Sequence, residues 1–91
     1  MWKVTLRVRI EHPNVRTPED CTLVKEAALP FVPVPGIGIK FPKGPSFFIG
    51  SVSYDVKTET FTLFQKRTSY DIKSMIREYT RGKTWGWKIE R

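Results

Sequence analysis

The sequence predicts a β-rich α+β domain. A strongly bent antiparallel sheet or small β-barrel of five to six strands is expected, with one α-helix of the C-terminal region packed on it. Apolar and polar residues alternate without a break over residues 2–11, which is the period of a half-buried strand. Over residues 68–82 the apolar residues recur at helical spacing instead. The 91 residues fit one compact domain, 1–91.

The first strand is expected to have a buried and an exposed face. Leu6 and Val8 belong to its apolar set, whereas Arg7 and Arg9 belong to the polar set. Because successive side chains of a strand point to opposite faces, the arginines should lie in solvent or face a partner. Residues 12–20, "HPNVRTPED", then carry the Pro, Asn and Asp residues that are typical of a loop.

The middle of the chain combines strand-like residues with turn residues. Residues 21–32 alternate weakly, but Pro30 limits any helix there, so a strand is favoured. Residues 31–45, "FVPVPGIGIKFPKGP", are apolar yet contain four prolines and three glycines. Pro35 and Gly36 suit the central positions of a type II turn, in which the glycine has positive φ. The favoured interpretation is a strand that folds sharply on itself, and the functional alternative is a rigid lip that presents Lys40 and Lys43.

A hairpin, a helix and a last strand are expected in the second half. Residues 46–66 are typical of a β-hairpin whose loop has about four to six residues. Thr68 with Asp71 matches a capping box at the helix start, and Gly82 matches a C-cap. Residues 83–91 alternate again and predict a terminal strand. The apolar face of the helix consists of Ile72, Met75, Ile76 and Tyr79.

Composition places the chain among small basic proteins. Sixteen Lys and Arg residues against nine Asp and Glu residues give a formal net charge of +7, which attracts polyanions. No apolar run approaches the roughly 20 residues of a membrane-spanning helix, so no membrane association is expected. The alternating N-terminus differs from a signal peptide, and Cys21 is the single cysteine. An intracellular, cytoplasmic setting is therefore expected, in a cell or for a viral protein.

The residues of the usual catalytic sites are missing. His12 is the only histidine and lies in a proline-rich loop, which favours a solvated side chain over a nucleophile's base. One histidine and one cysteine cannot supply the four ligands of a structural zinc site. Gly36 and Gly38 lack the third glycine and the lysine of a phosphate-binding loop. The sequence therefore predicts no catalytic residue, no metal site, no cofactor and no enzymatic activity.

Basic residues at helical spacing form the candidate binding site. Lys73, Arg77 and Arg81 recur at i, i+4 and i+8 and should form a ridge along the helix. Lys83 and Lys88 follow and extend the basic stretch. Cations next to aromatic residues suit phosphate and base contacts, although a solvated helix face has the same pattern. Further candidates on the outer face of the first strand are Arg7 and Arg9.

The favoured function is a small non-enzymatic binding module for an anionic partner, with nucleic acid or a nucleotide first. The alternative is a small inhibitor or adaptor, for example one encoded by a phage, that binds an acidic protein partner. Such a protein could act as a homo-oligomer. Both interpretations rest on positive charge, so direct binding measurements and the native mass are needed to separate them.

Overall fold

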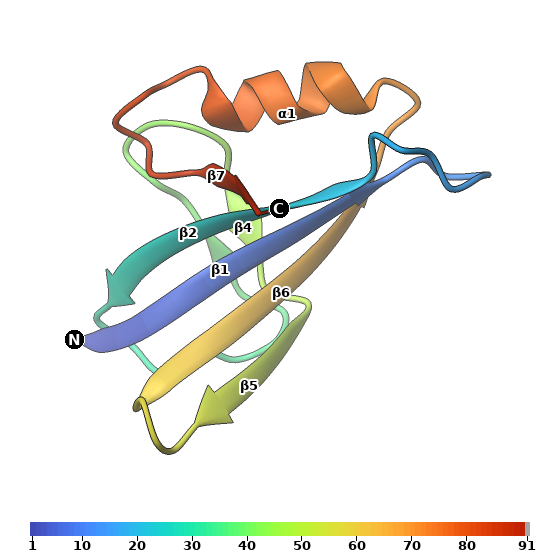
Figure 1. Cartoon of the computed structure of the whole chain (residues 1–91). Helices are drawn as coiled ribbons and strands as arrows, with labels where there is room; N and C mark the ends of the chain where they lie inside the picture. The colour runs from blue at the N-terminus through green and yellow to red at the C-terminus, as the bar shows by residue number, and fades with distance from the viewer. Residues whose placement is uncertain (91) are drawn as a thin grey trace.

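The computed structural model describes residues 1–90, which form a five-stranded sheet, a separate two-stranded ribbon and one helix (Figure 1). The sheet has the order β5-β6-β1-β2-β7, and it is strongly curved but not closed into a barrel. The predicted fold class is thereby confirmed. The elements are β1 (Trp2–Glu11), β2 (Cys21–Leu29), β3 (Gly38–Ile39), β4 (Phe47–Phe48), β5 (Ser51–Asp55), β6 (Thr60–Thr68), α1 (Ile72–Thr80) and β7 (Lys88–Glu90).

The first strand lies at the centre of the sheet. On one side β1 pairs antiparallel with β2, from Trp2 opposite Leu29 to Ile10 opposite Cys21. On the other side β1 pairs with β6 in parallel, starting at Val4 opposite Phe61. The sheet is therefore mixed, which alternation cannot reveal because both orientations give the same period of two.

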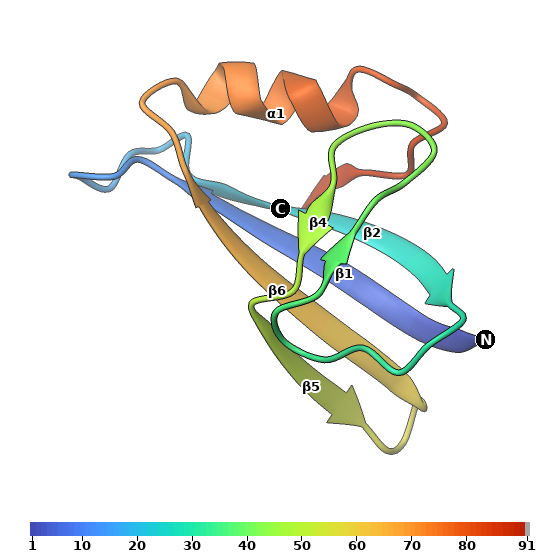
Figure 2. The same ribbon diagram turned by 180° about the vertical axis from the view of Figure 1, so that it is seen from behind.

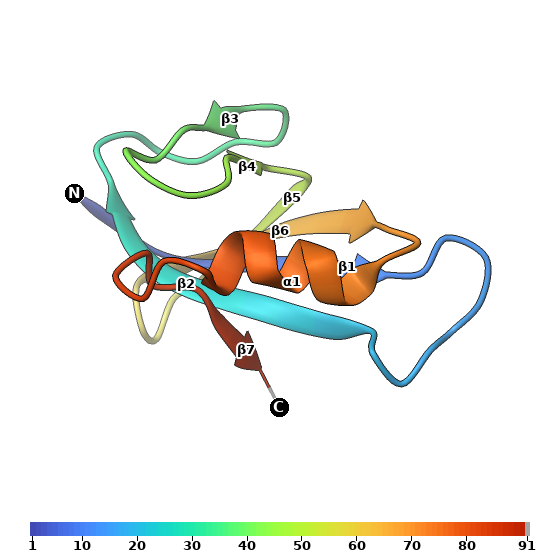
Figure 3. The same cartoon turned by 90° about the horizontal axis from the view of Figure 1, so that it is seen from above.

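One face of the sheet is covered and the other is open. The helix and the β3–β4 ribbon lie over the same face, as Figure 3 shows from above. Leu6 and Val8 point to this covered face and are fully buried, whereas Arg9 is exposed and Arg7 half-buried on the other face. The predicted orientation of the first strand is confirmed. We call the uncovered side the open face.

Aromatic rings join the helix and the ribbon to the sheet. Trp87 lies between Tyr79, with ring centroids 5.0 Å apart, and Phe47, with centroids 6.3 Å apart. Lys25 comes from the covered face of β2 and places its Nζ atom 3.8 Å from the ring centroid of Phe41. Burial lowers the pKa of Lys25 from its ordinary value, while the aromatic face attracts its charge.

The proline- and glycine-rich stretch contains the predicted turn, but it forms only the two-residue strand β3 in place of a strand that folds on itself. Gly36 has a φ of +92°, as the third position of a type II turn requires. β3 then pairs antiparallel with β4 through Gly38 opposite Phe48 and Ile39 opposite Phe47. We call the connecting loop, residues 40–46, the lip. Figure 2 shows it rising to the loop that follows α1.

The predicted hairpin over residues 46–66 is divided at Gly50. β4 pairs with β3, whereas β5 pairs with β6 through a four-residue loop, 56–59. The Gly50 amide donates to the carbonyl oxygen of Phe64 at 2.8 Å. A Cβ atom at Gly50 would lie 3.0 Å from that same oxygen, so glycine permits the close approach at which the chain changes sheet.

Both predicted helix caps are wrong. Thr68 still pairs with Glu11 at the end of β6, so its backbone is extended. Asp71 is the N-cap itself and accepts a hydrogen bond from the Ser74 amide at 3.0 Å. At the other end the cap is Arg81, in right-handed helical conformation. Gly82 follows it without positive φ.

The last strand is shorter than the alternation predicts. β7 contains only Lys88–Glu90 and pairs antiparallel with β2. Gly86 has a φ of +88°, which ends the extended conformation before the strand begins. Trp85 and Trp87 therefore lie in the loop between α1 and β7. The predicted strand residue Arg91 lies outside the described residues.

Loop 12–20 is held together by Asp20. Its carboxylate accepts hydrogen bonds from the Thr17 hydroxyl at 2.9 Å and from the His12 amide at 3.3 Å. Burial alone would raise the pKa of Asp20, but the hydrogen bonds from Thr17 and His12 and the charge of Arg9 lower it below its ordinary value.

Over the described part of the chain, no helix has the length and apolarity needed to cross a membrane.

Candidate functional site

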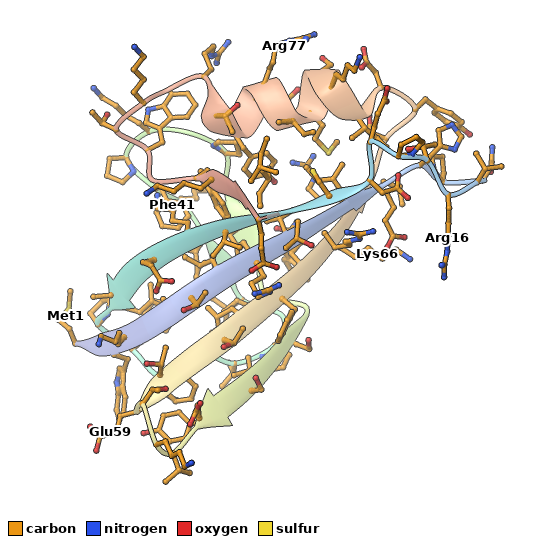
Figure 4. All side chains as sticks on the ribbon, in the orientation of Figure 1. Met1, Arg16, Phe41, Glu59, Lys66 and Arg77 are labelled. Carbon is orange, nitrogen blue, oxygen red and sulfur yellow. The ribbon has the colours of Figure 1, made fainter. Side chains whose placement is uncertain are left out.

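The structure divides the seven predicted site residues between two surfaces. Lys73, Arg77, Arg81 and Lys83 belong to α1 and the loop after it, and all four are exposed. Figure 4 shows Arg77 pointing away from the sheet. The three others, Arg7, Arg9 and Lys88, lie on the open face of the sheet.

Carboxylates accompany the cations of the open face. Arg7 meets Glu90 with both ends of its guanidinium group, and its Nη1 atom is 2.8 Å from Oε2. Arg9 pairs with Glu11 at 3.2 Å, and Lys66 contacts the same carboxylate at 3.5 Å. Because each of these cations has an acidic partner, the attraction of this surface for an added anion is reduced.

A shallow hollow on the open face also contains an aromatic ring. It has a volume of about 420 Å³ and is lined by Arg7, Arg9, Phe64 and Lys66, among other residues. The Phe64 side chain is 40% exposed there. Sequence reasoning missed Phe64 and Lys66, because β6 was expected to have apolar residues on both faces and its neighbour β1 was not known.

The cations at the end of the helix have no such partners. We call Lys43, Arg77, Arg81 and Lys83 the cationic surface. Within residues 1–90 none of these four forms an ion pair. Glu78 is the acidic residue that lines the hollows next to Arg77 and Arg81. The first residue of the predicted ridge differs, because Lys73 contacts Glu19 at 3.7 Å.

Trp85 fixes the lip against the end of the helix. A Cβ atom at Gly82 would lie 2.1 Å from Cε2 of the indole, so the ring lies directly against this glycine. On the lip, Gly44 has a φ of +89°, and a Cβ atom there would lie 3.0 Å from Cε3 of the same ring. The indole thus fills the space between the two segments and holds Lys43 close to Arg81.

These contacts form a hollow of about 560 Å³ lined by Lys43, Glu78, Arg81 and Trp85, with Gly44 and Pro45 of the lip. The Arg81 guanidinium carbon lies 5.8 Å from the Trp85 ring centroid. An anion at about 4 Å from one of these exposed cations gains about 1 kcal/mol, because water screens the attraction. The helix C-terminus has a partial negative charge of about one half, which cancels only a small part of the four full positive charges.

The structure adds one residue to the predicted ridge and separates another from it. Lys43 was considered only as part of the lip, and its place beside Arg81 depends on the contacts of Trp85 with Gly44 and Gly82. Lys88 was expected to extend the ridge, but the turn at Gly86 takes the chain to the edge of β2 first.

The residues considered for catalysis have structural contacts. His12 accepts a hydrogen bond at Nδ1 from the Asn14 amide at 3.2 Å, and its ring meets Tyr70 edge-on at a centroid distance of 5.3 Å. Cys21 is half-buried at the start of β2. In the part of the chain that the structure describes, no three His, Cys, Asp or Glu side chains gather as metal ligands would.

Comparison of the chain with protein-family models, with curated proteins and with solved structures found no significant match.

Proposed function

We propose that this protein is a non-enzymatic module that binds nucleic acid through its phosphate backbone, with the cationic surface as the contact. The observation that carries the proposal is the concentration of Lys43, Arg77, Arg81 and Lys83 without an ion pair to any described carboxylate. Phosphate groups are the polyanionic ligands that such unpaired cations attract, and their binding releases condensed counterions.

The proposed contact is to phosphates more than to bases. Trp85 is the aromatic residue of the hollow, and its ring already contacts Gly44 and Gly82. Contacts of lysine and arginine with phosphate oxygens carry no sequence information, so binding should be largely independent of sequence. Affinities of this kind are typically about 10⁻⁴ to 10⁻⁶ M at physiological salt. The proposal includes the setting expected from the sequence, which is the cytoplasm, for a cellular or a viral protein.

The test is a titration of fluorescent single- and double-stranded DNA and RNA at low and physiological salt. Arg77→Glu reverses a charge in the middle of the surface, and Lys57→Glu is its matched control in the exposed loop between β5 and β6. Each variant takes the formal net charge from +7 to +5. Arg77→Glu should weaken binding of every strand about equally and reduce the salt slope by roughly one unit or more, whereas Lys57→Glu should have a much smaller effect.

Three results would contradict the proposal. If wild type binds no strand at low salt, nucleic acid is not the ligand. If both variants weaken binding equally, net charge alone matters and the cationic surface is the wrong site. If Arg9→Glu reduces binding more than Arg77→Glu does, the open face is the contact instead.

A second candidate function is an adaptor or inhibitor that binds an acidic protein, and the free edge of the sheet favours it. β5 pairs only with β6 among the described strands, so its other edge can accept an added strand. Tyr54 of this strand is 45% exposed. A second copy of the chain could occupy the same edge, so the native mass over a concentration series tests self-association directly.

A further inference from the structure

A second hollow, of about 510 Å³, lies between the β3–β4 ribbon and the C-terminal half of β6. It shares Pro45 of the lip with the hollow of the cationic surface, and its other lining residues are different. Polar groups reach it from Lys40, Gln65 and Arg67, and an exposed ring from Phe48. Its lining within the described chain contains no carboxylate.

Arg67 is the charged group of this hollow that a bound anion would stabilise most. It is half-buried, and its Nη1 atom donates to the Tyr79 hydroxyl at 3.0 Å. No carboxylate of residues 1–90 pairs with it. A guanidinium group has five N–H donors in a planar fork that matches phosphate oxygens, and four remain after the bond to Tyr79. A partly desolvated arginine in this state favours a bound anion.

Gln65 and Lys40 add donors of the same kind. The Gln65 Oε1 atom accepts a hydrogen bond from the Phe48 amide at 3.1 Å. This bond uses one lone pair of the amide oxygen and leaves the NH₂ group, with two donors, for a ligand. Lys40 supplies an exposed ammonium group from the lip. The polar side chains of the hollow therefore offer mostly donors, which suits a ligand rich in acceptor oxygens.

Phe48 gives the hollow a flat apolar surface. Its side chain is 54% exposed, although the neighbouring Phe47 is fully buried. The hydrogen bond from its backbone to Gln65 fixes the residue beside the donors. A planar ring stacked on Phe48 would remove apolar surface of both rings from water. An anion attached to the stacked ring would then reach Arg67.

We propose that this hollow binds a nucleoside monophosphate, with the base on Phe48 and the phosphate held by Arg67, Gln65 and Lys40. The proposal does not rest on the proposed function, because the cationic surface is a different set of residues. Free nucleotide and a nucleotide unit of a longer strand have the same chemistry, and titration with each separates the two sources.

The test is a titration of the full chain with adenosine monophosphate, in which amide NMR spectra and calorimetry measure binding. Resonances of the lip, β4 and the C-terminal half of β6 should shift on binding. Phe48→Ala should weaken binding about tenfold, since stacking on an aromatic side chain has an effect of this order. Phe64→Ala is the matched control, because Phe64 is 40% exposed on the open face. Lys40→Ala and Arg67→Lys should also weaken binding. Because Lys40 is exposed, Lys40→Ala should not affect folding.

Several outcomes would overturn the proposal. The absence of shifts at millimolar nucleotide would do so, and so would equal weakening by Phe48→Ala and Phe64→Ala. Inorganic phosphate that binds as well as the nucleotide would show that the base has no part, and adenosine that binds as well would show that the phosphate has none. Tighter binding of phosphotyrosine would assign the hollow to another ligand class. The shifts of β4 and β6 report on this hollow, whereas the effect of Arg77→Glu on strand binding reports on the cationic surface, so failure here and failure of the cationic surface are distinguishable.

Discussion

At the scale of single residues, glycines decide how closely the segments around Trp85 approach one another. Gly82 has no positive φ, so its role is not conformational freedom. The space for its Cβ atom is occupied by the indole, 2.1 Å away. Gly38 offers a contrast, because an added Cβ atom there meets no described atom within 4 Å.

We expect Gly82→Ala to lower the free energy of unfolding by about 1–3 kcal/mol, because overpacking displaces the Trp85 ring. Gly38→Ala is the control and should have almost no effect or stabilise slightly. Denaturant unfolding measures both, and the tryptophan fluorescence of the folded state reports movement of the ring. Equal stability of the two variants would contradict the close contact between Gly82 and Trp85.

At the scale of elements, the helix start shows how local sequence can mislead. Thr68 and Asp71 have the spacing of a capping box, but the ladder between β6 and β1 extends to Thr68 and leaves capping to Asp71. Asp71→Ala should therefore destabilise the protein by about 0.5–2 kcal/mol, as loss of an N-cap does. Thr68→Ala should cost much less, since its side chain is exposed. Thermal unfolding of both variants is the measurement, and a larger loss for Thr68→Ala would restore the capping box.

Elements with long, regular patterns could be predicted from the sequence. Ten alternating residues defined β1, and helical spacing defined α1, because in both cases one face is buried against a core. Shorter elements depend on tertiary contacts. The division at Gly50 follows from its closeness to the Phe64 carbonyl, and the short β7 follows from the turn at Gly86.

The same distinction holds for the candidate site. Arg77 and Arg81 could be placed together because they are one helical turn apart. Lys43 joins them only through the contacts of the lip with Trp85, which sequence spacing does not contain. The hollow beside Arg67 likewise depends on the ribbon lying over the end of β6.

At the scale of the whole molecule, stability depends on the central strand. Leu6 is fully buried and lies between Lys25 of β2 and Leu63 of β6. Leu6→Ala should cost about 2–5 kcal/mol, a large part of the roughly 5–15 kcal/mol that stabilises a typical domain. Arg7→Ala should cost about 1 kcal/mol or less, because the Arg7 and Glu90 side chains are 30% and 42% exposed. Urea titration of both variants tests this, and a larger loss for Arg7→Ala would contradict the orientation of β1.

The parallel pairing of β1 with β6 also affects how a newly made chain reaches this structure. As the polypeptide leaves the ribosome, β1 can join β2 early, but its second edge must wait until residues 60–68 have emerged. Contacts between segments so distant in sequence form slowly, and an uncovered strand edge pairs readily with other chains in the meantime. The nascent protein is therefore most prone to aggregation during translation, when its most buried strand is still half-exposed.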